Sequence, residues 1–161
     1  MTKEEFEKAE KRYGPVDEIR PVEEIKSLRA LARWHFTMAR RIFLKDGYHS
    51  SIAFMVRDYQ PIKHLEVPFE DRSAKYLLMR LVADEVERCN ANAVMLVGEQ
   101  WATKADSKQP FLYPSEMPDR TEHLVLDVCA ESGESFSLTA QILRKEDAIK
   151  LGILLSLIAR S

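Results

Sequence analysis

Apolar residues recur every three or four positions in three parts of the chain, which is the spacing of one face of a helix. The first part begins at Pro21, a residue suited to a first helical turn, and ends at Asp46-Gly47. The second follows a cap at Asp71 or Ser73 and ends before residues 90–92. The third covers residues 146–159. Each of these stretches is predicted to form a helix that packs its apolar face on the rest of the protein.

The second predicted helix has a broad apolar face, and we expect that face to be buried. Its members recur at helical spacing and are Leu77, Leu78, Leu81, Val82, Val86 and Cys89.

Strands are predicted where apolar and polar residues alternate or where the chain is continuously apolar. Residues 49–58 and 62–69, joined by a turn at 59–61, predict one hairpin, and residues 122–130 and 136–143 predict a second. Residues 93–97 are apolar without interruption and predict an interior strand that continues through residues 98–101. Three prolines between residues 102 and 120 predict a long loop there.

The order of the predicted elements is α-β-β-α-β-β-β-α. Because two pairs of strands are joined by short turns, this order predicts an α+β fold with a five-stranded, largely antiparallel sheet and helices packed on it. The length of 161 residues fits one domain. We expect a charged N-terminal arm over residues 1–14, either a loose terminus or a docking helix, and a single α+β domain over residues 15–161.

Two resemblances accompany this pattern. In element order, the chain looks like profilin-like and roadblock-type domains, and more loosely like PAS or GAF sensor domains. The segment Gly98-Glu99-Gln100-Trp101, with residues 114–123 after the long loop, resembles a segment of small bacterial and phage proteins. The second resemblance implies that this loop matters, without implying an activity.

Charge and composition restrict the partners. The 24 basic and 26 acidic side chains give a net charge of −2 and are mixed along the chain, so no strong field favours nucleic acid or an anionic membrane. The basic residues of the first predicted helix are interpreted as its solvated face. The N-terminus lacks the apolar run of a signal peptide, and the apolar stretches are too short to span a bilayer. We therefore expect a cytoplasmic protein.

The isolated histidines and cysteines carry no recognised catalytic or metal-binding motif. His35, His49 and His64 are interpreted as structural or surface residues. Cys89 and Cys129 lie in apolar stretches and are interpreted as buried thiols.

The candidate chemistry lies around the long loop. Glu99, Glu116, Asp119 and His123, with Glu122, could converge as metal ligands or as an acid–base pair, because carboxylates and imidazole bind divalent cations. Their spacing is not diagnostic, and such residues also cap turns. The sequence therefore assigns no metal and no cofactor.

Three functions remain open at the level of sequence. The leading hypothesis is a non-catalytic interaction or regulatory domain that forms a homo-oligomer, because no catalytic signature occurs and the long loop could reach a protein partner. The second is a small metal-assisted hydrolase that uses the four candidate residues named above. The third is a sensor whose ligand lies between Trp101, Phe54 and Tyr113, with Arg120 as a further ligand-binding residue.

Overall fold

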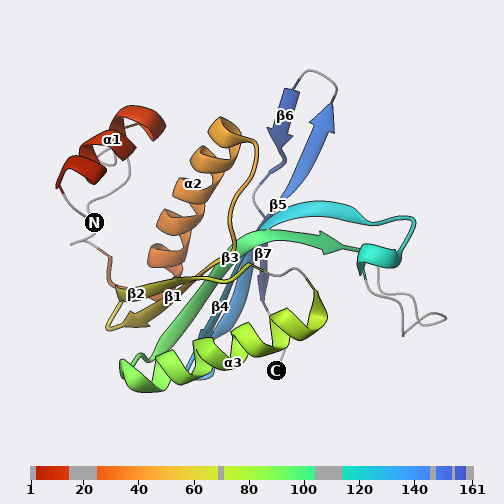
Figure 1. Ribbon diagram of the computed structural model, residues 1–161. Coiled ribbons are helices and arrows are strands. Elements are labelled where there is room, and N and C mark those ends of the chain that lie inside the picture. The colour runs from red at the N-terminus through yellow and green to blue at the C-terminus, as the bar shows by residue number, and fades with distance from the viewer. Residues whose placement is uncertain are drawn as a thin grey trace.

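One curled antiparallel sheet forms the centre of the protein (Figure 1). The computed structural model describes residues 3–14, 25–68, 71–103, 114–145, 148–153 and 155–158. Six strands follow one another across the sheet in the order β2-β1-β3-β4-β5-β6, and β7 pairs with β5 away from this path. The strands are β1 (Ile52–Arg57), β2 (Gln60–Glu66), β3 (Ala93–Ala102), β4 (Thr121–Ala130), β5 (Ser135–Lys145), β6 (Ala148–Leu151) and β7 (Leu155–Ile158).

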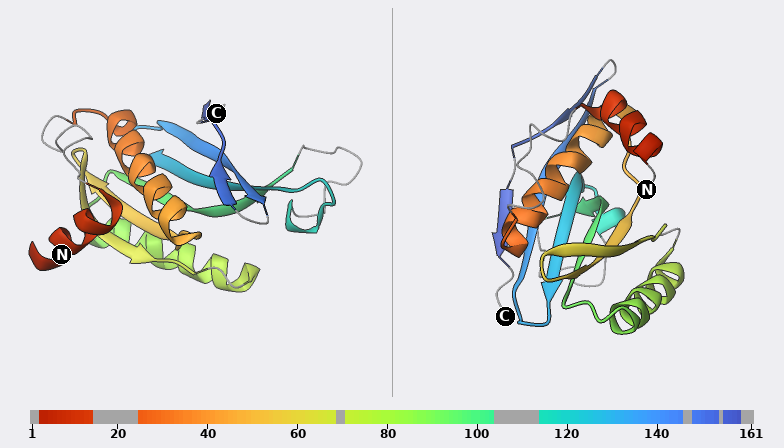
Figure 2. Two further views of the ribbon diagram at one scale, coloured as in Figure 1. Left: turned by 90° about the horizontal axis from the view of Figure 1, so that it is seen from above. Right: turned by 90° about the vertical axis from the view of Figure 1, so that its left-hand side faces the viewer.

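Helices lie on both faces of the sheet, and the main core is under α2 (Leu28–Asp46) (Figures 1 and 2). The α2 side chains Leu31, Phe36 and Phe43 are fully enclosed against alternate residues of β3, β4 and β5. A smaller core lies on the opposite face, where α3 (Arg72–Arg88) contributes Val82 against Ala53 of β1. The α+β class predicted from the sequence is thus confirmed.

The start of α2 differs from the prediction. Its first residue is Leu28, because the side chain of Ser27 accepts a hydrogen bond from the backbone N–H of Ala30 (3.1 Å) and caps the helix. Ile25 precedes the helix yet still enters the core, and Pro21 lies outside the described residues. The predicted stop is correct, since Gly47 adopts the left-handed conformation at φ +81°.

Both predicted hairpins are present. β1 and β2 are joined by Asp58 and Tyr59, which have φ values of 51° and 62°, so the turn comes earlier than predicted. β4 pairs with β5, and β3 lies between β1 and β4, as expected for an interior strand.

The helix predicted over residues 146–159 is wrong, because strands β6 and β7 occupy this region. β6 pairs with residues 142–145 of β5, and β7 pairs with residues 136–139. Between them, the N–H of Gly152 donates to the carbonyl of Gln141 (2.8 Å). Pairing with the free edge of β5 therefore determines the conformation of this segment. It outweighs the helix propensity indicated by the spacing of Ile149 and its neighbours, which is already low because glycine at position 152 disfavours a helix.

The N-terminal arm contains helix α1 (Lys3–Tyr13), whose end contacts the last turn of α2. The hydroxyl of Tyr13 donates to Asp46 (2.8 Å), and the guanidinium of Arg12 also binds that carboxylate. Hydrogen bonds from Arg12 and then Tyr13 hold the pKa of Asp46 below its usual value.

Candidate functional site

The four candidate residues, Glu99, Glu116, Asp119 and His123, lie near the long β3–β4 connection, but the sheet separates Glu99 from His123. In the register of β3 and β4, Glu99 is opposite Leu124, whereas His123 is opposite Gln100. Successive side chains of a strand point to opposite faces, so Glu99 lies on the α2 face and His123 on the other. Glu99 and His123 therefore do not meet at one site.

Glu99 instead belongs to a polar cluster on the α2 face, built around Arg144 of β5. The Arg144 guanidinium donates to Glu99 (3.0 Å), to both carboxylate oxygens of Glu122 (2.7 and 2.8 Å) and to the carbonyl of Gly47 (3.1 Å). The second oxygen of Glu99 accepts from the backbone N–H of His49 (2.7 Å). One arginine thus joins the end of α2 to three strands.

The electrostatics of this cluster are those of a structural contact. Burial and the neighbouring Glu122 raise the pKa of Glu99, although its hydrogen bond from His49 opposes the shift. Hydrogen bonds from Arg144 lower the pKa of Glu122. Each of the two carboxylates thus accepts two hydrogen bonds from the protein, which hold the ends of these strands together. The sequence did not predict a role for Arg144, because no motif around Leu143 and Lys145 marks this arginine.

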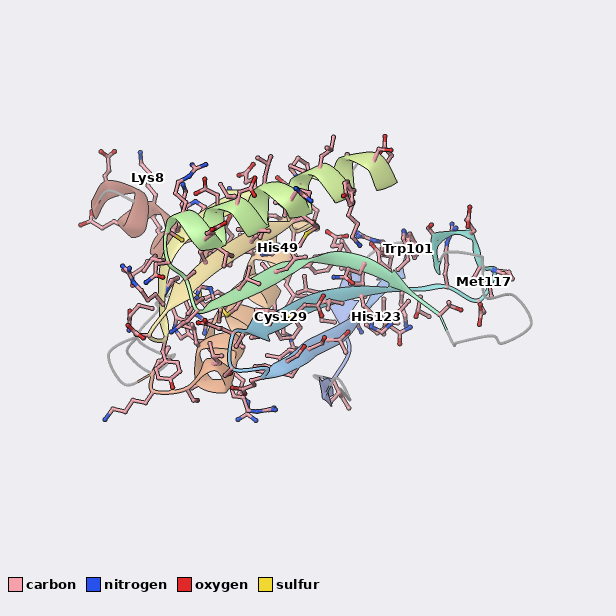
Figure 3. The ribbon with its side chains drawn as sticks, turned by 90° about the horizontal axis from the view of Figure 1, so that it is seen from below. Lys8, His49, Trp101, Met117, His123 and Cys129 are labelled. Atoms are coloured by element: carbon pink, nitrogen blue, oxygen red, sulfur yellow. The ribbon has the colours of Figure 1, made fainter. Side chains whose placement is uncertain are left out.

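His123 lies in a polar row on the opposite face, beyond the part covered by α3 (Figure 3). Its two ring nitrogens are 2.9 Å from the Thr121 hydroxyl and 3.0 Å from the Thr139 hydroxyl. Burial lowers the pKa of His123. The imidazole is thus held between two hydroxyls, and no carboxylate binds it within the described part of the chain.

The remaining predicted site residues lie near the outer end of the β3–β4 hairpin, where Trp101 and Met117 are seen in Figure 3. Asp119 accepts a hydrogen bond from the hydroxyl of Thr103 (2.7 Å). The guanidinium of Arg120 lies 4.7 Å from the centre of the Trp101 ring and also donates to the carbonyl of Ser115. These contacts join residues 115–120 to one another and to the end of β3, as expected of residues that cap turns.

Glu116 is in the short 3₁₀ helix η3 (Pro114–Glu116), where it is exposed. Tyr113 lies outside the described residues.

Two of the walls predicted for a ligand sensor, Phe54 and Trp101, do not meet. Phe54 pairs with Met95 of β3. Met95 is six residues before Trp101 on the same strand, so at a rise of about 3.3 Å per residue Phe54 and Trp101 are about 20 Å apart. Phe54 packs instead on the ring of His35, with ring centres 4.6 Å apart.

A cavity of about 420 Å³ lies at the other end of the sheet, away from the long loop. It is lined by Leu28, Asp58, Tyr59, Asn92, Glu131, Ser132 and Glu134, none of which was predicted as a ligand-binding residue.

The outer face of α3 differs from the prediction. Leu77 and Leu81 were expected in the buried face of this helix, yet their side chains are 63% and 54% exposed, and Tyr76 is 65% exposed. Val82 fills the position against the sheet. The apolar face of this helix is wider than the surface that packs on the sheet, so some of its apolar side chains remain exposed to solvent. The hydrophobic pattern alone does not show which of them are exposed.

The two cysteines also differ from the prediction, because Cys129 is exposed and Cys89 is only half-buried. Both fall at the ends of their elements, where apolar neighbours in sequence do not guarantee burial. Among the described residues, no three histidine, cysteine or acidic side chains gather in a way that could hold a metal ion. In the same residues, every helix is too short or too polar to cross a lipid bilayer.

These features define an α+β protein with one curled antiparallel sheet, helices on both faces, and polar clusters that stabilise its own elements. Comparison with known proteins narrows the class. The chain belongs to the family described as bacteriophage lambda protein ea47, whose profile matches residues 1–157. The expected resemblance to a phage protein family is confirmed.

A curated relative is protein ea47 of Escherichia phage lambda, which is 34% identical over 82 residues. The match covers 50% of this chain and only 20% of that protein, so most of the relative lies outside it. No solved structure matches the chain. The likeness to profilin-like and roadblock-type domains is therefore unsupported.

Proposed function

We propose that the chain is a non-catalytic interaction domain that associates with a second copy of itself. The observation that carries the proposal is the outer face of α3, defined here as Tyr76, Leu77, Arg80, Leu81 and Asp84. Its three large apolar side chains are each more than half exposed. Apolar side chains grouped on one face, rather than scattered singly, favour a surface that a partner covers.

The edge of the sheet is a weaker candidate for self-association. β2 is an edge strand that pairs only with β1 among the described strands. It carries Pro61 and Lys63, and its pairing with β1 is irregular between Met55 and Val56. Proline, lysine and bulges are features that prevent edge-to-edge pairing of sheets. We therefore favour the helical face over the strand edge.

The non-catalytic part of the proposal is supported by the polar clusters. Glu99 and Glu122 are bound by Arg144, and His123 is held between two hydroxyls on the other face of the sheet. A general acid or base needs a free position within hydrogen-bonding reach of its substrate. The hydrolase hypothesis would need these groups to separate from their partners, so it is not favoured.

Native mass spectrometry and sedimentation equilibrium from low to high micromolar concentration would test the proposal. We expect a monomer–dimer equilibrium of bare chains. Replacing Leu77 and Leu81 together by lysine should abolish the dimer, because charged side chains would have to be buried in its interface. The matched control replaces Leu44 and Ile153, which are exposed but lie elsewhere, and should leave the dimer unchanged. A strictly monomeric wild-type protein would overturn the proposal.

A further inference from the structure

The outer face of α3 carries charge as well as apolar surface, and its charged residues Arg80 and Asp84 form no ion pair with another described residue. Leu77, Arg80, Leu81 and Asp84 recur at spacings of three and four and therefore share one side of the helix. In the tertiary contacts, α3 packs mainly on β1, and the side chains of Leu77 and Leu81 are more than half exposed.

The opposite flank of α3 differs in this respect. There Glu85 forms ion pairs with Lys63 of β2 and with Arg88. Within the part of the chain that the structure describes, no ion pair or hydrogen bond involves the side chain of Arg80 or Asp84. The two could pair within the helix, but an acidic residue placed after its basic partner is the less favourable order at this spacing. Two opposite charges thus lie beside Leu81, and neither forms an ion pair with another described residue.

We infer that two copies of the chain pair through antiparallel α3 helices, with Arg80 of each copy beside Asp84 of the other. This inference rests on the proposed self-association and adds its geometry. A two-fold axis level with Val82 places residue 80 of one helix opposite residue 84 of the second, twice by symmetry. The same axis brings Leu81 next to Leu81 of the second copy, at the centre of the contact.

Charge distinguishes this arrangement from a parallel one. Parallel helices in register would set Arg80 against Arg80 and Asp84 against Asp84, so both contacts would be repulsive. The antiparallel pair makes both contacts attractive and surrounds the central leucines with charged side chains. Because a two-fold contact uses the same surface on both copies, assembly stops at the dimer.

Charge reversal and mixing test the geometry. Arg80→Glu and Asp84→Arg should each weaken the homodimer about tenfold, since two exposed contacts change from attractive to repulsive. An equimolar mixture of these two variants should form a heterodimer of about wild-type affinity, because both contacts again join opposite charges. The doubly substituted chain should form its own dimer and should not mix with the wild type. Fluorescence-detected sedimentation with one labelled species measures each case.

A parallel arrangement predicts the opposite result in the last mixture, where wild-type and doubly substituted chains would prefer each other. That outcome would overturn the inference while leaving self-association intact. The matched control is Arg33→Glu, which makes the same charge change on the exposed part of α2 and should not alter the affinity. If the leucine variants dissociate the dimer and no charge variant does, the antiparallel geometry is wrong and the proposed function stands. A monomeric wild type would remove both.

Discussion

His35 should make the stability of the protein depend on pH. Its ring lies between Trp34 and Phe54, with ring centres 4.8 and 4.6 Å away, and its Nε2 atom is buried without a hydrogen-bond partner among the described residues. Burial lowers the pKa of His35 from 6.5 to about 4. The folded protein therefore holds this imidazole neutral at a pH where the unfolded chain protonates it.

The direction and size of the effect follow from proton linkage. Because the folded pKa is below the unfolded one, the unfolded state binds the extra proton, and stability falls as the pH decreases from about 6.5 towards about 4. Each pKa unit corresponds to about 1.4 kcal/mol, and the calculated loss attributable to His35 is roughly 2 kcal/mol between about pH 7 and about pH 5.

The assay is urea unfolding followed by circular dichroism at both pH values. His35→Phe keeps an aromatic ring at this position without a titrating group, so it should lose roughly 2 kcal/mol less than the wild type on acidification. The control is His64→Gln, which removes an exposed histidine of β2. If wild type and His35→Phe lose equal stability between the two pH values, the burial argument is refuted.

Three further substitutions test contacts described above. Arg144→Met should lower the free energy of unfolding by about 1 kcal/mol near neutral pH, because it leaves the carboxylates of Glu99 and Glu122 without their arginine. The loss should be smaller in acid, where these carboxylates are protonated, and a loss that does not change with pH would contradict this reasoning. Gly98→Ala should cost about 1–3 kcal/mol in urea unfolding, because its Cβ would lie 2.6 Å from Ser51 Oγ and 3.2 Å from Ser51 Cα; adding Ser51→Gly should recover part of the loss. Ser27→Ala should cost about 1 kcal/mol through the lost cap of α2, which thermal unfolding would detect as a lower midpoint.

The parts of the fold that the sequence predicted depend on local signals. The hairpins combine alternating apolar residues with short turns, and the end of α2 coincides with a glycine in the left-handed conformation. The prediction for the last segment was wrong for the converse reason. Ile149 and Ile153 have helical spacing with later residues, but the free edge of β5 is available only in the folded sheet. A pairing partner distant in sequence cannot be inferred from local periodicity.

The sequence drew attention to the β3–β4 region, where Glu99 and Glu122 contact Arg144. It could not show that Glu99 and His123 face opposite ways, because that depends on which residue of β4 is opposite which residue of β3. It also could not pair Glu99 with Arg144, since the two come together only when β5 is added to the sheet.

The division of β5 between two partners has a consequence for motion. Each of β6 and β7 is four residues long and covers a separate part of the same strand. A short strand that pairs with one other strand can detach at a small fraction of the free energy needed to unfold the whole domain. We therefore expect β6 and β7 to detach from β5 in two separate steps. Amide hydrogens there should exchange much faster than those of β3, which has neighbours on both sides. While either strand is detached, the unpaired backbone of β5 is exposed, and these brief openings are the states from which aggregation would begin.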